Sequence, residues 1–173
     1  ERLAIVTNGG GPAVLAADSA NVLKLQVASV KDLGEESTPQ DYVQAMQAAV
    51  ADRGADGVLL IHTPKAGCDN EAVARAVSEV FSPASKPVLG CWMGDATVQA
   101  SRQLLADKGM PVFRTPEGAV DAFHNIASFY RNQQLLQQTP PPLSHLADPD
   151  TEGARLLIEG VLAERRKVLT EME

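Results

Sequence analysis

Cysteine and histidine are scarce in this chain, with two and three residues among 173. Cys68 and Cys91 form no CxxC pair, and the histidines join no cysteine cluster, so the ligand spacing of a zinc site is missing. Two cysteines cannot supply the disulfide framework of a small secreted domain. We therefore expect no metal site and a reduced, cytoplasmic compartment.

Long hydrophobic runs and an excess of positive charge are also missing. No apolar run approaches the ~20 residues that span a bilayer, and the start Glu1-Arg2-Leu3 does not resemble a signal peptide. The net charge of −7 argues against a general nucleic-acid or membrane surface. We expect neither nucleic acid nor membrane as a partner.

The chain does contain enough apolar residues for a core, since 45% of its residues are hydrophobic. Short apolar runs alternate with longer amphipathic segments. The expected strands are Leu3–Thr7, Gly57–His62, Pro87–Trp92 and Val112–Arg114, with a weaker one near Leu23–Ala28; the expected helices are Pro12–Ala20, Pro39–Arg53, Asn70–Phe81, Ala96–Lys108 and Pro116–Gln137. Apolar strands separated by helices predict an α/β fold of three layers, with a parallel sheet covered on both faces.

The last part of the chain has a different pattern. A proline tract at 139–143 indicates a stiff linker over residues 139–150. Residues 151–171 have a helical pattern with an apolar stripe, so we divide the chain into a domain (1–138), the linker and a C-terminal helical segment (151–173). The chain begins directly on a predicted strand and ends inside this helical pattern, so we expect it to be a piece of a longer polypeptide.

Three glycines and a proline, Gly9 to Pro12, separate the first predicted strand from the first predicted helix. Glycines let the backbone turn tightly and approach a ligand, and proline suits the first helical position. A strand, a glycine turn and a helix start leave free backbone N–H groups at the positive end of a helix dipole. This arrangement is typical of an anion site, most often one for phosphate.

Other glycine-loop motifs fit this sequence poorly. Val14 stands where a dinucleotide fingerprint needs a third small residue, and no acidic residue closes a clear second strand. No Gly-Lys-Ser/Thr follows, which excludes a P-loop. A flavin-phosphate loop needs more hydroxyl side chains, and a phosphorylation receiver needs carboxylates where Asn8 and His62 stand. A tight turn without any ligand remains an alternative.

Several strings of the chain, taken together, are specific. They are residues 3–18, Asp32-Leu33-Gly34, Thr38–Tyr42, Lys86–Leu89, Trp92-Met93-Gly94, residues 109–120 and Tyr130-Arg131-Asn132-Gln133. With them the chain resembles a domain of the NDP-forming acyl-CoA synthetases, which include ADP-forming acetate–CoA ligase and are relatives of succinyl-CoA synthetase. The resemblance covers nearly the whole chain and implies the second of two flavodoxin-like (ligase-CoA) domains, with residues 151–173 as the lead-in to an ATP-grasp domain.

The resemblance also implies a chemistry. In the family, ATP or ADP exchanges phosphate with a histidine, the phosphohistidine activates a carboxylate as an acyl phosphate, and coenzyme A then forms the thioester. The histidine belongs to a sister domain, so this chain supplies no catalytic residue and is inactive alone. Its glycine loop would stabilise the phosphohistidine through residues Asn8, Gly9, Gly10, Gly11, Ala13 and Val14.

The parent enzyme implied by the resemblance uses ATP or ADP, Mg and coenzyme A, none of them bound by this domain alone. The expected partners are the sister flavodoxin-like and CoA-binding domains and the ATP-grasp domain. A flavodoxin-like strand order would bring two further loops to the glycine loop, with His62, Thr63, Gly67 and Gly94 as a possible rim. His62 has a second interpretation, a structural histidine bonded to nearby backbone, and Trp92 is expected to pack under its loop.

One departure from the family concerns the segment before Asp32. Family members carry Asn-Pro there and a longer connection, whereas Ser29-Val30-Lys31 stands in this chain. Either the second crossover is shortened or residues are missing near 21–31. A second function also stays open: a ligase-like, acyl-CoA-sensing regulatory module of a fused protein lysine acetyltransferase.

Overall fold

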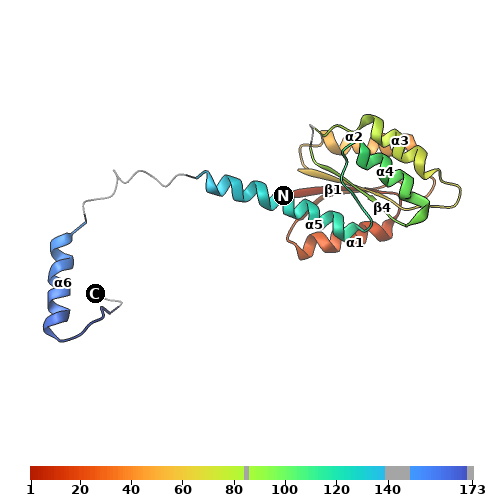
Figure 1. Cartoon of the computed structure of the whole chain (residues 1–173). Coiled ribbons are helices and arrows are strands. Elements are labelled where there is room, and N and C mark those ends of the chain that lie inside the picture. Colours follow the sequence, from red (N-terminus) through yellow and green to blue (C-terminus); the bar gives the residue numbers. More distant parts are fainter. Residues whose placement is uncertain (84–85, 139–148, 171–173) are drawn as a thin grey trace. The chain divides into compact units, whose positions relative to one another are not determined.

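The computed structural model describes residues 1–83, 86–138 and 149–170, in which strands and helices alternate along the chain (Figure 1). The strands are β1 (Arg2–Thr7), β2 (Gln26–Asp32), β3 (Gly57–His62), β4 (Val88–Trp92) and β5 (Val112–Phe113). The helices are α1 (Gly10–Val22), α2 (Pro39–Ala51), α3 (Asn70–Val80), the 3₁₀ turn η1 (Ala96–Val98), α4 (Gln99–Asp107), α5 (Pro116–Leu136) and α6 (Thr151–Ala163).

All five strands form one parallel sheet in the order β2-β1-β3-β4-β5. This is the flavodoxin-like order, and the predicted α/β class is confirmed. The strand order reverses between β1 and β3: β2 is added on one side of β1, and β3 to β5 are added on the other. Strands β1 and β3 pair from Leu3↔Gly57 to Thr7↔Ile61. Ligands of such sheets bind at the carboxyl ends of the strands beside this reversal. The loop after β1 lies at that point.

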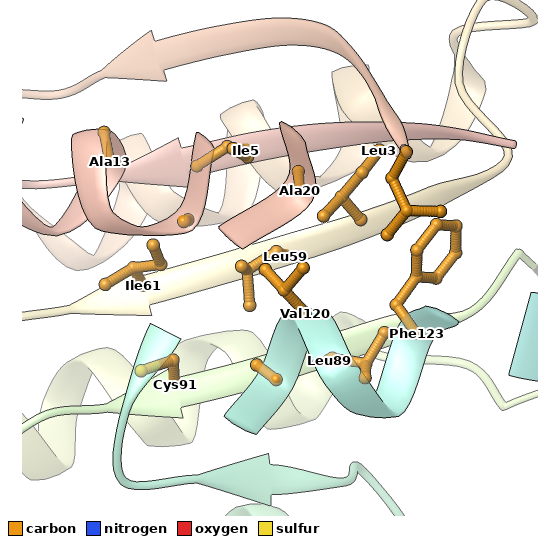
Figure 2. Close-up of a cluster of buried hydrophobic side chains, with 13 residues drawn as sticks. Leu3, Ile5, Ala13, Ala20, Leu59, Ile61, Leu89, Cys91, Val120 and Phe123 are labelled. Carbon is orange, nitrogen blue, oxygen red and sulfur yellow. The ribbon is translucent and has the colours of Figure 1, made fainter. Parts of the chain in front are cut away.

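Two hydrophobic clusters, one on each face of the sheet, form the core. On the first face α1 and α5 cover the strands, and Figure 2 shows Val120 and Phe123 of α5 next to Leu59 and Leu89. On the second face α2, α3 and α4 cover the strands, with Tyr42, Met46 and Leu105 among the buried side chains. Because both faces are covered, the inner strands carry apolar residues without polar alternation.

Alanines bring α1 close to the sheet. Ala13, Ala16 and Ala20 are its buried residues, at no more than 6% exposure. Their small side chains do the work that the third glycine of a dinucleotide fingerprint does in other folds. The outer residues of α1 include Val14 and Leu15, which are exposed.

Among residues 1–138, three predicted elements differ most from the structure. Helix α1 begins at Gly10 instead of Pro12, because glycines at 10 and 11 adopt helical geometry. The weak strand lies at Gln26–Asp32, later than the predicted 23–28; as the edge strand it is mostly exposed and has a weak apolar pattern. The predicted helix from Ala96 is divided into η1 and α4.

The structure divides into two compact units, Glu1–Leu135 and Leu136–Glu173. In the second unit α6 ends at Ala163, before the predicted 171, and Arg165 has a positive φ of 60°. The predicted proline linker falls largely on residues 139–148. These residues, which include His145, lie outside the described part of the chain, as do residues 171–173. Within the described ranges, every helix is too short or too polar to cross a lipid bilayer.

Candidate functional site

The N-terminus of α1 offers two unpaired backbone donors. Gly9 is its N-cap, and the N–H of Gly9 donates to Thr7 Oγ1 at 3.1 Å. Pro12 is the third helical residue and carries no N–H. No hydrogen bond is recorded among the described residues for the N–H of Gly10 or Gly11, and both residues are exposed. Two of the four N–H groups that a helix start leaves unsatisfied are therefore available to a ligand.

Neither backbone conformation nor packing within the described residues requires glycine at positions 9 to 11. Gly9, the N-cap, is extended, with φ −164° and ψ 132°. The glycines with positive φ are Gly34, Gly67, Gly94 and Gly109, so the predicted tight turn does not depend on left-handed glycine here. A Cβ on Gly9 or Gly10 would meet its nearest atom at 3.7 Å, and one on Gly11 would meet nothing within 4 Å. The absence of side chains at these positions leaves open space next to the start of α1.

The predicted phosphate residues offer different groups. In a regular helix the N–H groups of Ala13 and Val14 bond to the carbonyls four residues before them, at Gly9 and Gly10. Ala13 is buried, and Val14 is exposed on the helix surface. The Asn8 side chain, 1% exposed, pairs with Thr63: its Oδ1 accepts from the Thr63 N–H at 2.8 Å, and its Nδ2 donates to the Thr63 carbonyl at 2.9 Å.

An acidic side chain lies beside the loop. Asp32 is the last residue of β2, which corrects the expectation that no acidic residue closes a second strand. Its Oδ2 lies 3.7 Å from the position of a Cβ on Gly10, and its Oδ1 accepts from the Gly34 N–H at 2.9 Å. A carboxylate at this place stabilises the positive helix end and repels an incoming anion.

His62, predicted as a possible rim residue, is fully buried. Its Nδ1 lies 2.8 Å from the Tyr42 hydroxyl and its Nε2 lies 2.8 Å from Asn70 Oδ1. Asn70 donates through Nδ2 to the Thr97 carbonyl, so its oxygen faces His62 and accepts from Nε2–H. Tyr42 then donates to Nδ1 of a neutral ring. Burial lowers the pKa of His62, and the hydrogen bond with Asn70 opposes this shift.

Two of the other three rim predictions, Thr63 and Gly94, lie in loops next to the glycine loop. Thr63 follows β3, and its hydroxyl lies 3.9 Å from Met93 Sδ after β4. Gly94, with φ 106°, is in contact with Pro64: a Cβ there would lie 3.4 Å from Pro64 Cγ. The three predicted loops, after β1, β3 and β4, therefore do meet at the carboxyl edge.

Gly67, the fourth rim prediction, belongs to a cavity that the glycine loop does not line. It has φ 80° and lines a cavity of about 270 Å³ with residues of two loops, among them Glu35, Ser37 and Cys68. The Lys65 ammonium joins these loops by an ion pair of 2.8 Å with Glu35. Burial raises the pKa of the partly exposed Cys68 thiol, and Asp69 adds to this shift.

Trp92 and Cys91 belong to the core. Both are fully buried, and the Trp92 ring lies 5.4 Å from the ring of His62, which confirms that the tryptophan packs under its loop. Burial raises the pKa of Cys91 to about 12. Asp69 caps α3 by accepting from the N–H groups of Glu71 and Ala72 at 3.1 and 2.9 Å. Within the described residues no three His, Cys, Asp or Glu side chains gather as a metal site would require.

Sequence reasoning missed the side chain that organises the loop after β4. The Arg102 guanidinium of α4 donates to the carbonyls of Trp92, Gly94 and Asp95 at 3.0, 2.8 and 3.3 Å. An arginine in an amphipathic helix carries no local sign of this role. Tyr42 and Asn70 were missed as partners of His62 for the same reason, since they lie 20 and 8 residues from it.

Comparison with known proteins finds that the chain is similar to parts of ADP-forming acyl-CoA ligases. No protein-family model matches the chain. It is 28% identical over 148 residues to the ADP-forming acetate–CoA ligase I of Archaeoglobus fulgidus, covering 73% of the chain and 21% of that protein. It is 22% identical to the ADP-forming 4-hydroxybutyrate–CoA ligase of Nitrosopumilus maritimus, over 99% of the chain and 27% of that protein.

A third relative is subunit alpha of the ADP-forming acetate–CoA ligase II of Pyrococcus furiosus, 26% identical over 76% of the chain and 34% of that subunit. The chain thus spans about a fifth to a third of the length of these relatives. The homology is distant and extends over most of the chain.

Solved structures agree with the fold. PH0766 of Pyrococcus horikoshii OT3 matches with a TM-score of 0.67 and 25% identity, over 76% of this chain and 36% of that one. The dinucleotide-forming acetyl-coenzyme A synthetase 1 of Ca. Korarchaeum cryptofilum, in complex with phosphate and ADP, matches with a TM-score of 0.71 and 19% identity, over 86% of this chain and 36% of that one. At this identity the second match concerns the fold alone.

Proposed function

We propose that this chain, a distant homologue of the ADP-forming acyl-CoA ligases, is the phosphohistidine-docking domain of such a ligase. In this proposal the N–H groups of Gly10 and Gly11 stabilise a phosphoryl group that a histidine of another domain carries. The observation that supports it most directly is the pair of unpaired, exposed donors at the start of α1. A ligand that accepts two hydrogen bonds and carries negative charge fits them.

The open space around the loop supports an external ligand. Neither the backbone conformation of Gly9 nor the packing around Gly11 requires glycine, because a Cβ would be accommodated at both positions. Side chains there would instead lie between the free N–H groups and an approaching group. The loop also lies at the carboxyl edge, beside the reversal between β1 and β3, where such sheets bind ligands.

We assign the histidine that carries phosphate to another domain, because the described histidine nearest the glycine loop in the fold, His62, is unsuited to the role. His62 is closed off by Tyr42 and Asn70 and has no exposed surface. The N–H groups of Gly10 and Gly11 can position a phosphoryl group and stabilise its negative charge, but they form no covalent bond to it. Contacts of an N–H with a charged acceptor contribute about 1.5–3 kcal/mol each, and more in a site that excludes water.

The ligase chemistry itself is part of the proposal. A phosphoryl group would move between a nucleotide, the histidine and a carboxylate substrate, and coenzyme A would then displace phosphate to form the thioester. The relatives, acetate and 4-hydroxybutyrate ligases, are named for small carboxylic acids. We extend to this chain only the class, an acid–CoA ligase that forms ADP, with the remaining machinery on its sister domains.

The anion site can be tested on the chain itself. We expect inorganic phosphate to shift the amide NMR signals of Gly10 and Gly11 in a saturable way at constant ionic strength, with chloride as the control. Asp32→Asn should bind phosphate more tightly, because it removes a like charge beside Gly10. Wild-type protein without a saturable response at Gly10 and Gly11 would exclude the site.

The ligase role can be tested in the multidomain protein. Gly11→Glu, which places a carboxylate at the donor pair, should lower acyl-CoA-dependent ATP formation by about 100-fold or more. Asn21→Glu adds the same charge at the other, exposed end of α1 and should leave the rate within about twofold. Equal turnover of both variants would sink the proposal.

A further inference from the structure

Asn8 connects two loops of the candidate site through its side chain alone. The backbone pairing of β1 with β3 ends at Thr7↔Ile61. One residue later, the Asn8 carboxamide accepts from the Thr63 N–H at 2.8 Å and donates to the Thr63 carbonyl at 2.9 Å. The side chain thus takes the place of a further peptide unit and extends the contact between the two chain segments beyond the sheet.

Asparagine is the residue type that this contact requires. Its amide presents one acceptor and one donor to the two backbone groups of Thr63. Aspartate lacks the donor, and leucine, of similar shape, lacks both. At 1% exposure Asn8 also has no open face from which to bind a phosphate, although the sequence pattern places it among the phosphate-binding residues.

The adjacent residue completes the restraint. The fully buried Thr7 hydroxyl donates to the Gly9 carbonyl at 3.0 Å and accepts from the Gly9 N–H at 3.1 Å. Gly9 is the N-cap, so the residues just before Gly10 and Gly11 are held by two buried side chains. The directions of the two free N–H groups depend on where this segment is held.

We propose that Asn8 is the positioning residue of the anion site: its carboxamide pins the glycine loop to Thr63, so that the N–H groups of Gly10 and Gly11 converge on one anion. This inference rests on the proposed role of the loop in binding a phosphoryl group. It assigns to Asn8 a task carried out through the backbone of other residues, with no contact to the anion.

The test uses Asn8→Leu and inorganic phosphate as the probe. We expect hydrogen exchange of the Thr63 amide to accelerate at least tenfold, and the Kd for phosphate, measured from the Gly10 and Gly11 amide shifts, to rise at least fivefold. Thr38→Ala is the matched control: it removes the capping box of α2, which packs on the opposite face of the sheet from α1, and should leave the phosphate Kd within twofold.

Each outcome decides the inference. If Asn8→Leu accelerates hydrogen exchange of the Thr63 amide but leaves the Kd for phosphate at the wild-type value, Asn8 is merely structural. That result overturns this inference and leaves the proposed function standing. A wild-type chain without phosphate-dependent shifts at Gly10 and Gly11 overturns both this inference and the proposed function. If Asn8→Leu does not give a folded chain, Asn8→Ser, a small polar replacement too short to reach both Thr63 groups, is measured with the same expectations.

Discussion

Single residues at the carboxyl edge have their roles set by what they contact. Asn8 and His62 are both polar, both buried, and both stand at or just after the end of a strand. Asn8 joins two loops through the backbone of Thr63, whereas His62 joins α2 and α3 through the side chains of Tyr42 and Asn70. Neither side chain has a polar group facing solvent, so each is satisfied inside the protein.

The buried histidine makes stability depend on pH. Because burial lowers the pKa of folded His62 below its ordinary value of 6.5, the unfolded chain binds a proton that the folded chain does not. The contribution of neutral His62 is complete above pH 6.5 and declines as the pH falls from there toward the folded pKa. The limiting slope for one proton is about 1.4 kcal/mol per pH unit.

We therefore expect the free energy of unfolding, measured with urea between pH 7.5 and 5, to fall more steeply for the wild type than for His62→Gln. Above pH 7.5 this residue should add no pH dependence to either protein. Parallel curves for the two proteins over the acid range would contradict the assignment of a neutral, buried His62.

At the scale of elements, helix starts divide into closed and open ones. Thr38 closes α2 with a full capping box, in which its side chain and that of Asp41 each accept from the other's backbone N–H. Asp69 closes α3 by accepting from two backbone N–H groups. The N-cap of α1, Gly9, has no side chain to offer, so α1 is the one of these three helices that lacks a side-chain cap. This difference supports the proposal that a ligand binds at the start of α1.

Glycine also has two different structural roles in these elements. Gly57 begins β3, and a Cβ there would overlap the ring of Phe123 from α5. Gly11 lies in the first turn of α1, where a Cβ would meet no atom within 4 Å. One glycine makes room for a core side chain, and the other faces open space.

The two glycines should respond in opposite ways to the same substitution. Gly57→Ala should destabilise the chain by about 1–3 kcal/mol, because the Phe123 ring has to move within a packed core. Gly11→Ala should leave the free energy of unfolding unchanged or raise it by up to about 1 kcal/mol, since alanine favours helix. Chemical denaturation of both variants checks this, and equal losses would refute the distinction.

At the scale of the whole molecule, the sheet unit is complete within itself. Both core clusters draw their buried residues from Leu3 to Phe123. The second unit, Leu136–Glu173, contains α6, whose buried residue is Val161 while Leu156, Leu157 and Leu162 are exposed. A short helix with exposed leucines gains little stability by itself.

A chain ending at Gln138 should therefore unfold within about 2 °C of the full 173-residue chain, because the truncation removes no residue of either cluster. Differential scanning calorimetry of the two chains makes the comparison. A fall of 5 °C or more would mean that the sheet unit depends on the second unit.

The sequence alone determined what depends on near neighbours. Apolar strands without polar alternation gave the parallel sheet, Thr38 before Pro39 gave the start of α2, and the glycine run gave the place of an open helix start. These features need only a few adjacent residues, because strand and helix periodicity, capping and turns are local. Where the local signal was weak, as in the exposed edge strand β2, the boundaries were wrong.

Only the tertiary structure decided which distant groups meet. It paired Asn8 with Thr63 across 55 residues, closed His62 between two helices, and brought Asp32 next to Gly10. These contacts follow from the order of strands in the sheet, since parallel strands gather their carboxyl ends at one edge whatever their separation in sequence. The glycine run therefore predicted where the free donors are, and the fold determined what holds them and what stands beside them.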